Sequence, residues 1–213
     1  MVRGNTVTAV MLVLLALLLV PTAARAGFSV GGNLLLSLPQ EDFANVSESG
    51  GGLSIKLLFS PPLMPAIAVR ADVGFVVYGS ENYRDQVAGI PVDITVRNQS
   101  VQFTVGPQFQ SPMGPVRVYA APMVGVYNYS TRLELEGTDI GETQNSTTKF
   151  GWNINGGMLV RVYQSPIKKF KLDINLEGKY HTIKEAIETE IDGVTTTSDA
   201  NDISLHVGVL FHF

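Results

Sequence analysis

The amino-acid sequence predicts an all-β fold, an eight-stranded antiparallel up-and-down transmembrane β-barrel. Apolar and polar residues alternate with period two through eight segments, which places apolar side chains on one face of each strand and polar ones on the other. The connectors between these segments alternate between short and long, which is typical of up-and-down membrane barrels with an even strand number. Hydrophobic residues make up 45% of the 213 residues and charged residues 16%, a composition too apolar for a disordered chain.

Residues 1–26 are predicted to be a signal peptide that is cleaved off, leaving one barrel domain over residues 27–213. Arg3 precedes an apolar run over residues 7–20, and small residues end at Ala26, where a signal peptidase would cut. An uncleaved anchor is the alternative, but the run is shorter than the roughly 20 apolar residues of a spanning helix. The chain has no cysteine, so we expect neither a lipoprotein nor disulfides.

Eight segments carry the alternating pattern. In the clearest one the apolar set is Phe170, Leu172, Ile174 and Leu176, and the polar set is Lys171, Asp173, Asn175, Glu177 and Lys179. A strand of this kind separates charge from apolar surface, and each segment is about long enough to cross a bilayer at a tilt. The predicted strands are residues 28–38, 53–60, 67–78, 101–106, 117–126, 150–161, 170–180 and 203–213.

Three connectors are short and contain proline, and four are long and polar. Ser-Pro sequences open turns, and the short connectors are residues 60–65, 111–115 and 164–167. The long connectors are residues 39–49, 79–91, 136–147 and 184–199. Up-and-down membrane barrels have short turns on the periplasmic side and long loops outside, and we expect the same arrangement here.

Two prolines and one change of parity interrupt the pattern. Pro107 and Pro122 fall inside predicted strands, although a closed barrel has no free edge on which to place them. Bulges or strand ends are expected there, and the sequence leaves the register of both strands open. Ile94 and Val96 have the opposite parity to the strand that follows, which predicts a bulge or a strand that rises above the membrane.

Nine charged residues fall on the polar faces, which would line the barrel interior. They are Lys56, Arg70, Asp72, Arg117, Arg161, Lys171, Asp173, Glu177 and Lys179. The interior of an eight-stranded barrel is only wide enough to be filled by side chains, and buried charges must pair. We expect the basic residues to pair with the three acids, supported by Asn153, Asn155 and Asn175. Such an interior is either an ion path or a plug that replaces a hydrophobic core, and we favour the plug.

The remaining polar and aromatic residues are assigned to the two membrane surfaces. Most of the 19 acidic residues lie in or near the long loops, as solvated surface or, alternatively, as a site for divalent cations that bridge lipopolysaccharide. No loop has the acidic spacing of a calcium-binding loop. Trp152 and Tyr180 are expected at the lipid headgroups, and Tyr78, Tyr127 and Tyr129 at the outer rim, in an aromatic girdle.

The last predicted strand ends on an aromatic residue with apolar residues at every second position behind it: Leu205, Val207, Val209, Phe211 and Phe213. This segment resembles the closing strand of bacterial outer-membrane β-barrels. The mature chain resembles the outer membrane protein β-barrel domain family, which is related to the OmpA transmembrane domain. The resemblance implies a location in the outer membrane of a Gram-negative bacterium and contact with outer-membrane lipid and lipopolysaccharide. It also implies that the barrel assembly machinery recognises the last strand.

The sequence predicts no catalytic residue, cofactor or metal site. His181 and His206 would face inward, but some outer-membrane barrels that hydrolyse lipid A carry a His-x-Ser pair on one strand face, and neither histidine here has a serine two residues later. No HExxH motif and no phosphate-binding loop is present.

The expected function is that of a non-enzymatic outer-membrane barrel with a side-chain-filled lumen and acidic extracellular loops, acting in envelope integrity or surface interaction. The first alternative is a narrow, porin-like channel or small-hydrophobe transporter. The others are a lipid A-modifying barrel enzyme and a soluble lipocalin-like binder, whose apolar residues would face inward. The chain is expected to be a monomer without a nucleic-acid partner.

Overall fold

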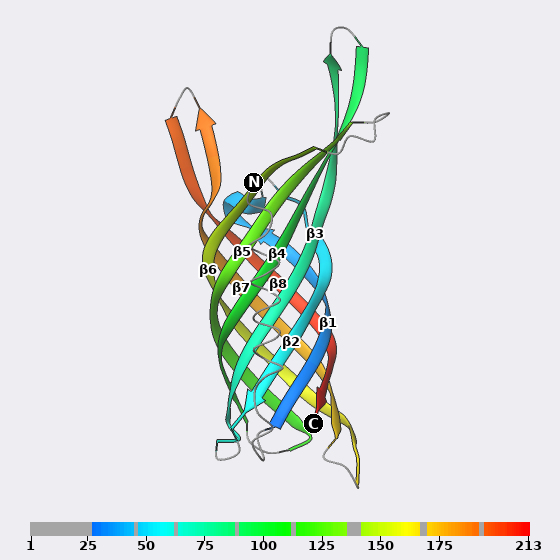
Figure 1. Cartoon of the computed structure of the whole chain (residues 1–213), viewed down its shortest axis with the longest axis vertical. Coiled ribbons are helices and arrows are strands. Elements are labelled where there is room, and N and C mark those ends of the chain that lie inside the picture. The colour runs from blue at the N-terminus through cyan, green and yellow to red at the C-terminus, as the bar shows by residue number, and fades with distance from the viewer. Residues whose placement is uncertain are drawn as a thin grey trace.

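The computed structural model is a closed antiparallel barrel of eight strands (Figure 1). It describes residues 27–44, 47–61, 64–87, 90–111, 114–135, 142–166, 170–191 and 194–213. The strands are β1 (Gly27–Gln40), β2 (Gly50–Ser60), β3 (Ile67–Val87), β4 (Ile90–Gln110), β5 (Val116–Leu135), β6 (Glu142–Gln164), β7 (Lys171–Ile191) and β8 (Val194–His212). A short helix, α2 (Glu41–Ala44), follows β1, and the described residues include no helix that could span a membrane.

The strands pair in chain order and close between β8 and β1, which confirms the predicted up-and-down topology. A path along paired residues leaves β1 at Val30, goes once around the barrel, and returns to β1 at Gln40, ten residues further on. This stagger over eight strands corresponds to a strand tilt of roughly 40° and to an interior that side chains can fill. The predicted signal peptide lies outside the described residues.

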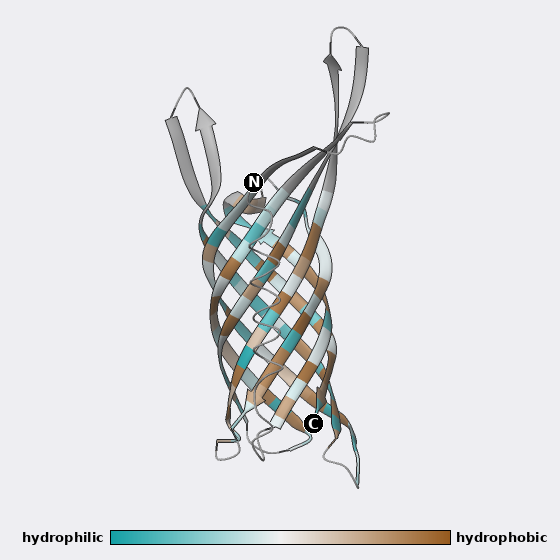
Figure 2. Cartoon of the chain, in the orientation of Figure 1, coloured by the Kyte–Doolittle hydropathy of each residue, from teal (hydrophilic) through white to brown (hydrophobic). Residues whose placement is uncertain are grey.

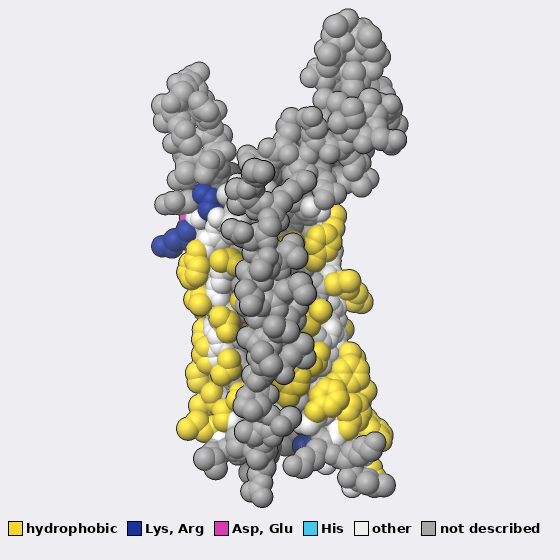
Figure 3. Space-filling view, viewed as in Figure 1, with side chains coloured by type: hydrophobic (Ala, Val, Ile, Leu, Met, Phe, Trp, Pro, Cys, Tyr) yellow, Lys and Arg dark blue, Asp and Glu magenta, His cyan; other side chains and the backbone are white. Residues whose placement is uncertain are grey.

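Apolar side chains cover the outside of the barrel, and most of the buried side chains inside it are polar. Ile174 and Leu176 are 37% and 41% exposed, whereas Asp173 and Glu177 on the same strand are 0% and 5% exposed. Figure 2 shows hydrophobic and hydrophilic residues alternating along the strands, and Figure 3 shows hydrophobic side chains over the visible wall. This orientation suits a wall surrounded by acyl chains, and it excludes the soluble barrel with an apolar interior.

In three of the four predicted long loops, the residues that the structure describes are β-structure. The hairpins β3–β4, β5–β6 and β7–β8 continue beyond the barrel (Figure 1), so residues 79–87, 142–147 and 194–199 are strand. The prediction of loops was wrong here because it relied on polarity. Strands that pair with each other in water satisfy their backbone groups without an apolar face.

Pro107 and Pro122 occupy directly opposed positions on β4 and β5. The pairs on either side of them are intact: Val105–Val124 and Phe109–Ala120. The pairing is interrupted only in between, where neither proline has an N–H to donate, so both missing donors fall in one place. The ladders from β4 to β3 and from β5 to β6 continue past the prolines without a shift of register. The expectation of a bulge or a strand end at these two positions was therefore wrong.

The change of parity near Ile94 coincides with an irregularity in the same sheet. The pairing of β3 and β4 shifts between Val77 and Ser80, and β4 continues above this point to Ile90. The extra residue of this shift lies on β3, and β4 pairs with β5 without a shift from Ile94 to Val105. The prediction of a rising strand is therefore confirmed, whereas β4 itself has no bulge there.

Candidate functional site

The middle of the lumen holds five charged side chains, which we call the middle layer: Lys56 of β2, Arg70 and Asp72 of β3, and Glu177 and Lys179 of β7. All five are buried. Glu177 accepts hydrogen bonds from Lys56 Nζ at 2.7 Å and from Arg70 Nη1 and Nη2 at 2.7 and 2.8 Å. Asp72 accepts from Arg70 Nε at 2.9 Å and Nη2 at 2.5 Å, and from Lys179 Nζ at 2.6 Å. Each acid therefore binds at least two cations, as charges removed from water require.

Tyr119 of β5 completes the middle layer from the opposite wall. Its hydroxyl is hydrogen-bonded to Glu177, to Asn175 Oδ1 at 2.6 Å and to Lys56 Nζ at 3.2 Å. Gly157 on β6 leaves room for the ring, because a Cβ there would lie 2.6 Å from the Tyr119 hydroxyl oxygen. The sequence places Tyr119 on the polar face, but its partners on β2 and β7 meet it only because the barrel closes.

A second charged group, the lower layer, lies nearer the end with the short turns. Asp173 is bound there by Arg117, by Arg161 Nε at 3.2 Å and by His212 Nε2 at 2.8 Å. Lys171 is partly buried at this end of β7. The nine charged residues singled out from the sequence thus lie in two separate layers rather than in one network.

The three asparagines expected to support the charges have different roles. Asn175 accepts from Tyr119 and donates to Asn33 Oδ1 at 2.8 Å, so it does border the middle layer. Asn153 donates to the Tyr127 hydroxyl at 2.8 Å, and the Asn155 amide nitrogen lies 2.9 Å from Met123 Sδ. These two serve neutral neighbours instead.

A chain of neutral hydrogen-bonding groups lies above the middle layer. Ser204 Oγ lies 2.9 Å from His206 Nε2 and 3.0 Å from His181 Nε2. His206 Nδ1 lies 3.2 Å from Ser54 Oγ, and His181 Nδ1 lies 3.2 Å from the Tyr127 hydroxyl. Both histidines face inward, as predicted, and every ring nitrogen has a partner. The search for a serine after each histidine missed Ser204, because it precedes His206 in the chain.

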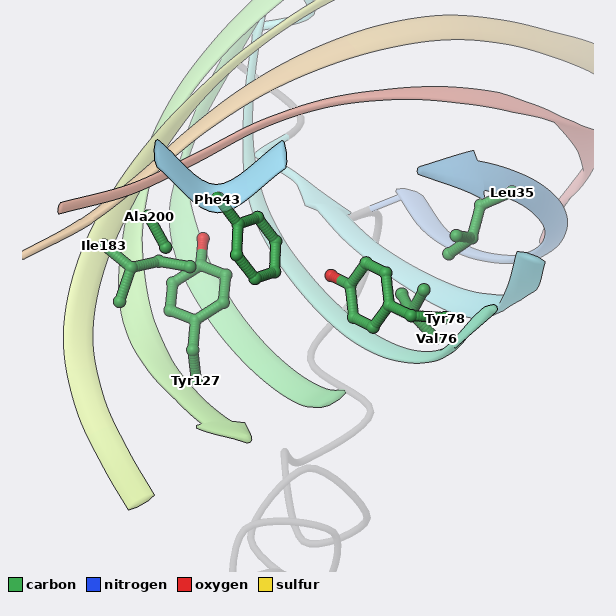
Figure 4. Packing of buried hydrophobic residues seen from close by; sticks show 7 residues of the cluster. All are labelled: Leu35, Phe43, Val76, Tyr78, Tyr127, Ile183 and Ala200. Atoms are coloured by element: carbon green, nitrogen blue, oxygen red, sulfur yellow. The ribbon is translucent and has the colours of Figure 1, made fainter. Parts of the chain in front are cut away.

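Apolar and aromatic side chains close the outer mouth of the lumen, in a region that we call the vestibule (Figure 4). Its buried members are Leu35, Phe43, Val76, Tyr78, Tyr127, Ile183 and Ala200, and Tyr129 packs against them. Phe43 comes from α2 and packs edge-on against Tyr78 and Tyr129, with ring centroids 5.5 and 5.8 Å apart. The helix therefore places an aromatic ring over the mouth of the barrel.

The prediction that three tyrosines belong to an outer aromatic girdle was wrong. Tyr78 and Tyr127 are only 4% and 2% exposed, inside the barrel, and Tyr129 packs against the same cluster. Glycine on a neighbouring strand makes this possible, since a Cβ at Gly151 would lie 2.9 Å from the Tyr127 ring. Trp152 and Tyr180 do face outward, with ring centroids 6.2 Å apart.

The closing strand faces the lipid with its apolar positions. Leu205, Val207, Val209, Phe211 and Phe213 are all exposed. The Phe213 amide donates to the Phe28 carbonyl at 2.9 Å, beside β1. The last strand thus carries both the aromatic end and the seam that closes the barrel.

A closed sheet with an apolar outer wall and a polar lumen defines an integral membrane β-barrel, because only such a sheet satisfies every backbone group within lipid. The model of the outer membrane protein beta-barrel domain family matches residues 9–213. The chain belongs to this family, and it is a bacterial outer-membrane protein.

Two solved structures share this fold. The chain is similar to Neisserial surface protein A, with a TM-score of 0.57 and 16% identity. It is also similar to Ail, the attachment invasion locus protein of Yersinia pestis, in complex with the heparin analogue sucrose octasulfate, with a TM-score of 0.52 and 14% identity. Both comparisons cover 89% of this chain and 100% of the other chain. No curated protein matches the sequence significantly.

Proposed function

We propose that this protein is a non-conducting, non-enzymatic monomer that acts in envelope integrity or surface interaction through its extracellular hairpins. The observation that carries the proposal is the middle layer, where charged side chains of β2, β3 and β7 bind one another across the lumen. A barrel of this width with such a layer is blocked by its own side chains.

The energetics of the middle layer favour a plug over an ion path. A passing ion would have to separate Glu177 from Lys56 and Arg70, and removal of one partner from a buried pair costs roughly 3–5 kcal/mol. The lower layer around Asp173 and the vestibule beneath Phe43 lie on the same route. Three obstacles in series support a closed lumen over a narrow channel or a small-hydrophobe transporter.

The hairpins outside the barrel support a role at the cell surface. They extend the sheet beyond the vestibule, and residues 184–199 contain five acidic residues and one lysine. The names of the two similar structures, a surface protein and an attachment protein, are in keeping with this role. We further propose that lipopolysaccharide and outer-membrane lipid contact the wall, and that the assembly machinery recognises the Phe211 and Phe213 end of β8.

Electrical recording from planar bilayers tests the closed lumen. Protein extracted from outer membranes in dodecylmaltoside should insert without any steady conductance step, whereas an outer-membrane porin treated identically should conduct. A reproducible step from the purified protein would overturn the proposal in favour of the narrow channel.

The absence of enzymatic activity is tested separately. Ser204 and its two imidazoles lie under the closed vestibule, and their hydrogen bonds hold the lumen together. We expect mass spectra of lipid A to be the same in cells that express the wild-type protein, Ser204→Ala or His206→Ala. A change in acylation that occurs with the wild type and is lost in Ser204→Ala would establish a hydrolase.

A further inference from the structure

The vestibule contains a buried carboxylate that differs from those deeper in the lumen. Asp202 on β8 is 6% exposed, and both its oxygens accept from Ser37 Oγ at 2.9 Å. In the part of the chain that the structure describes, Asp202 has no ion-pair partner, whereas Asp72, Asp173 and Glu177 each bind at least two basic groups. A buried anion without a cation is costly, so this position is suited to a positive charge from outside the chain.

The groups around Asp202 indicate what kind of cation would fit. Asp202 lines a small cavity together with the rings of Tyr78, Tyr127 and Tyr129. Tyrosine faces attract cations through the ring quadrupole, and sites lined by several aromatic rings recognise alkylated ammonium groups. A metal ion would instead need several oxygen or nitrogen ligands, and the described residues contain no cluster of three metal-ligating side chains.

Phe43 lies beside two tyrosines that line this cavity, and Figure 4 shows its ring between those of Tyr78 and Tyr127. The ring packs edge-on against Tyr78 and Tyr129. The helix that carries it has four residues, and its first residue, Glu41, has a φ of 52°, which is unfavourable for a residue with a side chain. Asn201 Nδ2 holds Glu41 at 2.5 Å. A short, strained segment held at its edge can leave more readily than a strand of the barrel wall.

We propose that the vestibule is a binding site for a small organic cation with an alkylammonium group. The rings of Tyr78, Tyr127 and Tyr129 surround the ammonium group, and Asp202 supplies the countercharge. Phe43 fills the entrance when no ligand is bound and moves aside when one enters. The site opens toward the outside of the cell, above the closed middle layer, so binding there requires no passage through the lumen.

Choline and its uncharged isostere 3,3-dimethyl-1-butanol test the site, because the two molecules have nearly the same shape and differ in charge. Binding is measured by saturation-transfer NMR titrations on the full protein in dodecylmaltoside, which contains no ammonium group. We expect choline to bind the wild type at least about tenfold more tightly than the isostere. Equal binding of the two, or no binding of choline, would overturn the proposal.

Asp202→Asn keeps the shape of the side chain and removes its charge. We expect this variant to bind choline roughly tenfold more weakly and the isostere unchanged. Unaltered choline binding would show that Asp202 is not the countercharge. If the variant does not assemble, Tyr129→Leu replaces it, since Tyr129 is only partly buried. Loss of choline affinity in Tyr129→Leu supports the cage, and unchanged affinity contradicts it.

Phe43→Ala tests whether the Phe43 ring acts as a lid over the site formed by Tyr78, Tyr127, Tyr129 and Asp202. Removal of the ring should strengthen choline binding several-fold, because the ligand no longer displaces it, and weaker binding would refute a lid.

Glycerophosphocholine distinguishes the source of the ammonium group. Affinity equal to or above that of choline indicates a lipid headgroup, and lower affinity indicates a free amine. A conducting lumen would leave these results unaffected, so the site and the proposed function can fail independently.

Discussion

The middle layer and the vestibule lie one above the other in the same lumen and close it by different means. In the middle layer every acid is bound by two or more cations, from strands on different sides of the barrel. In the vestibule apolar contact dominates, the lid ring comes from a short helix outside the barrel wall, and one carboxylate has no cation among the described residues. The middle layer is therefore part of the barrel's framework, whereas the Phe43 ring can leave the vestibule without disturbing the strands.

This difference shows how a narrow barrel combines a rigid interior with a mouth whose side chains can move. Ion pairs that link β2, β3 and β7 cannot be broken singly without leaving a buried charge. Rings that pack edge-to-face lose only a modest contact energy when they part. Substitutions in the two regions should therefore lower the free energy of unfolding by very different amounts. Ranking these losses tests whether the two regions differ as described.

The largest effect is expected for Glu177→Leu in the middle layer. The substitution removes the acid that binds Lys56, Arg70 and Lys179, and we expect the free energy of unfolding to fall by roughly 3–5 kcal/mol. Urea unfolding in dodecylmaltoside micelles, followed by fluorescence of the single tryptophan, Trp152, measures the change. The control is Gln99→Ala, which removes one neutral hydrogen bond to Ser130. A loss no larger than that of the control would mean that the charges are not a framework.

A smaller effect is expected for Tyr119→Phe, which keeps the ring and removes the hydroxyl bound to Glu177 and Lys56. A hydrogen bond to a charged group contributes roughly 1.5–3 kcal/mol, and we expect a destabilisation in that range. The same urea titration measures it. Since both residues act in one network, Tyr119→Phe should add little in the Glu177→Leu background, and full additivity would show that the hydroxyl acts elsewhere.

Ser204→Ala affects the neutral chain between the two regions. It removes the hydroxyl that both His181 and His206 contact, and we expect a loss of about 1–2 kcal/mol from the two unsatisfied imidazole groups. Ser204→Thr, which keeps a hydroxyl, is the matched control. Equal losses in both variants would indicate a packing effect instead of lost hydrogen bonds.

The smallest effect on global stability is expected for Phe43→Ala in the vestibule. A buried phenylalanine in a barrel strand would cost several kcal/mol to remove, but α2 is outside the wall, so we expect less than about 1 kcal/mol in urea titrations. Limited proteolysis should instead cut residues 39–49 faster than in the wild type. A loss as large as that of Glu177→Leu would show that the vestibule belongs to the framework as well.

Much of the architecture could be predicted from local sequence pattern. Alternation along 170–180 fixed which side chains face the lumen, because a strand has a period of two whatever its neighbours are. The prolines near residues 62 and 112 marked the short turns, because proline restricts the backbone locally. The bounds of the hairpins could not be predicted, since polar residues in water form a strand only when a partner strand is present.

Local sequence pattern was enough to predict the class of fold, the direction in which Asp173, Glu177, Ile174 and Leu176 point, and the outward apolar face of the closing strand, since all of these follow from the period of one strand. The folded barrel was needed to show which charges meet, that Tyr78 and Tyr127 lie inside, that Ser204 lies between two histidines, and that Pro107 opposes Pro122. These relations depend on the stagger between strands far apart in the chain, and no local pattern encodes that stagger.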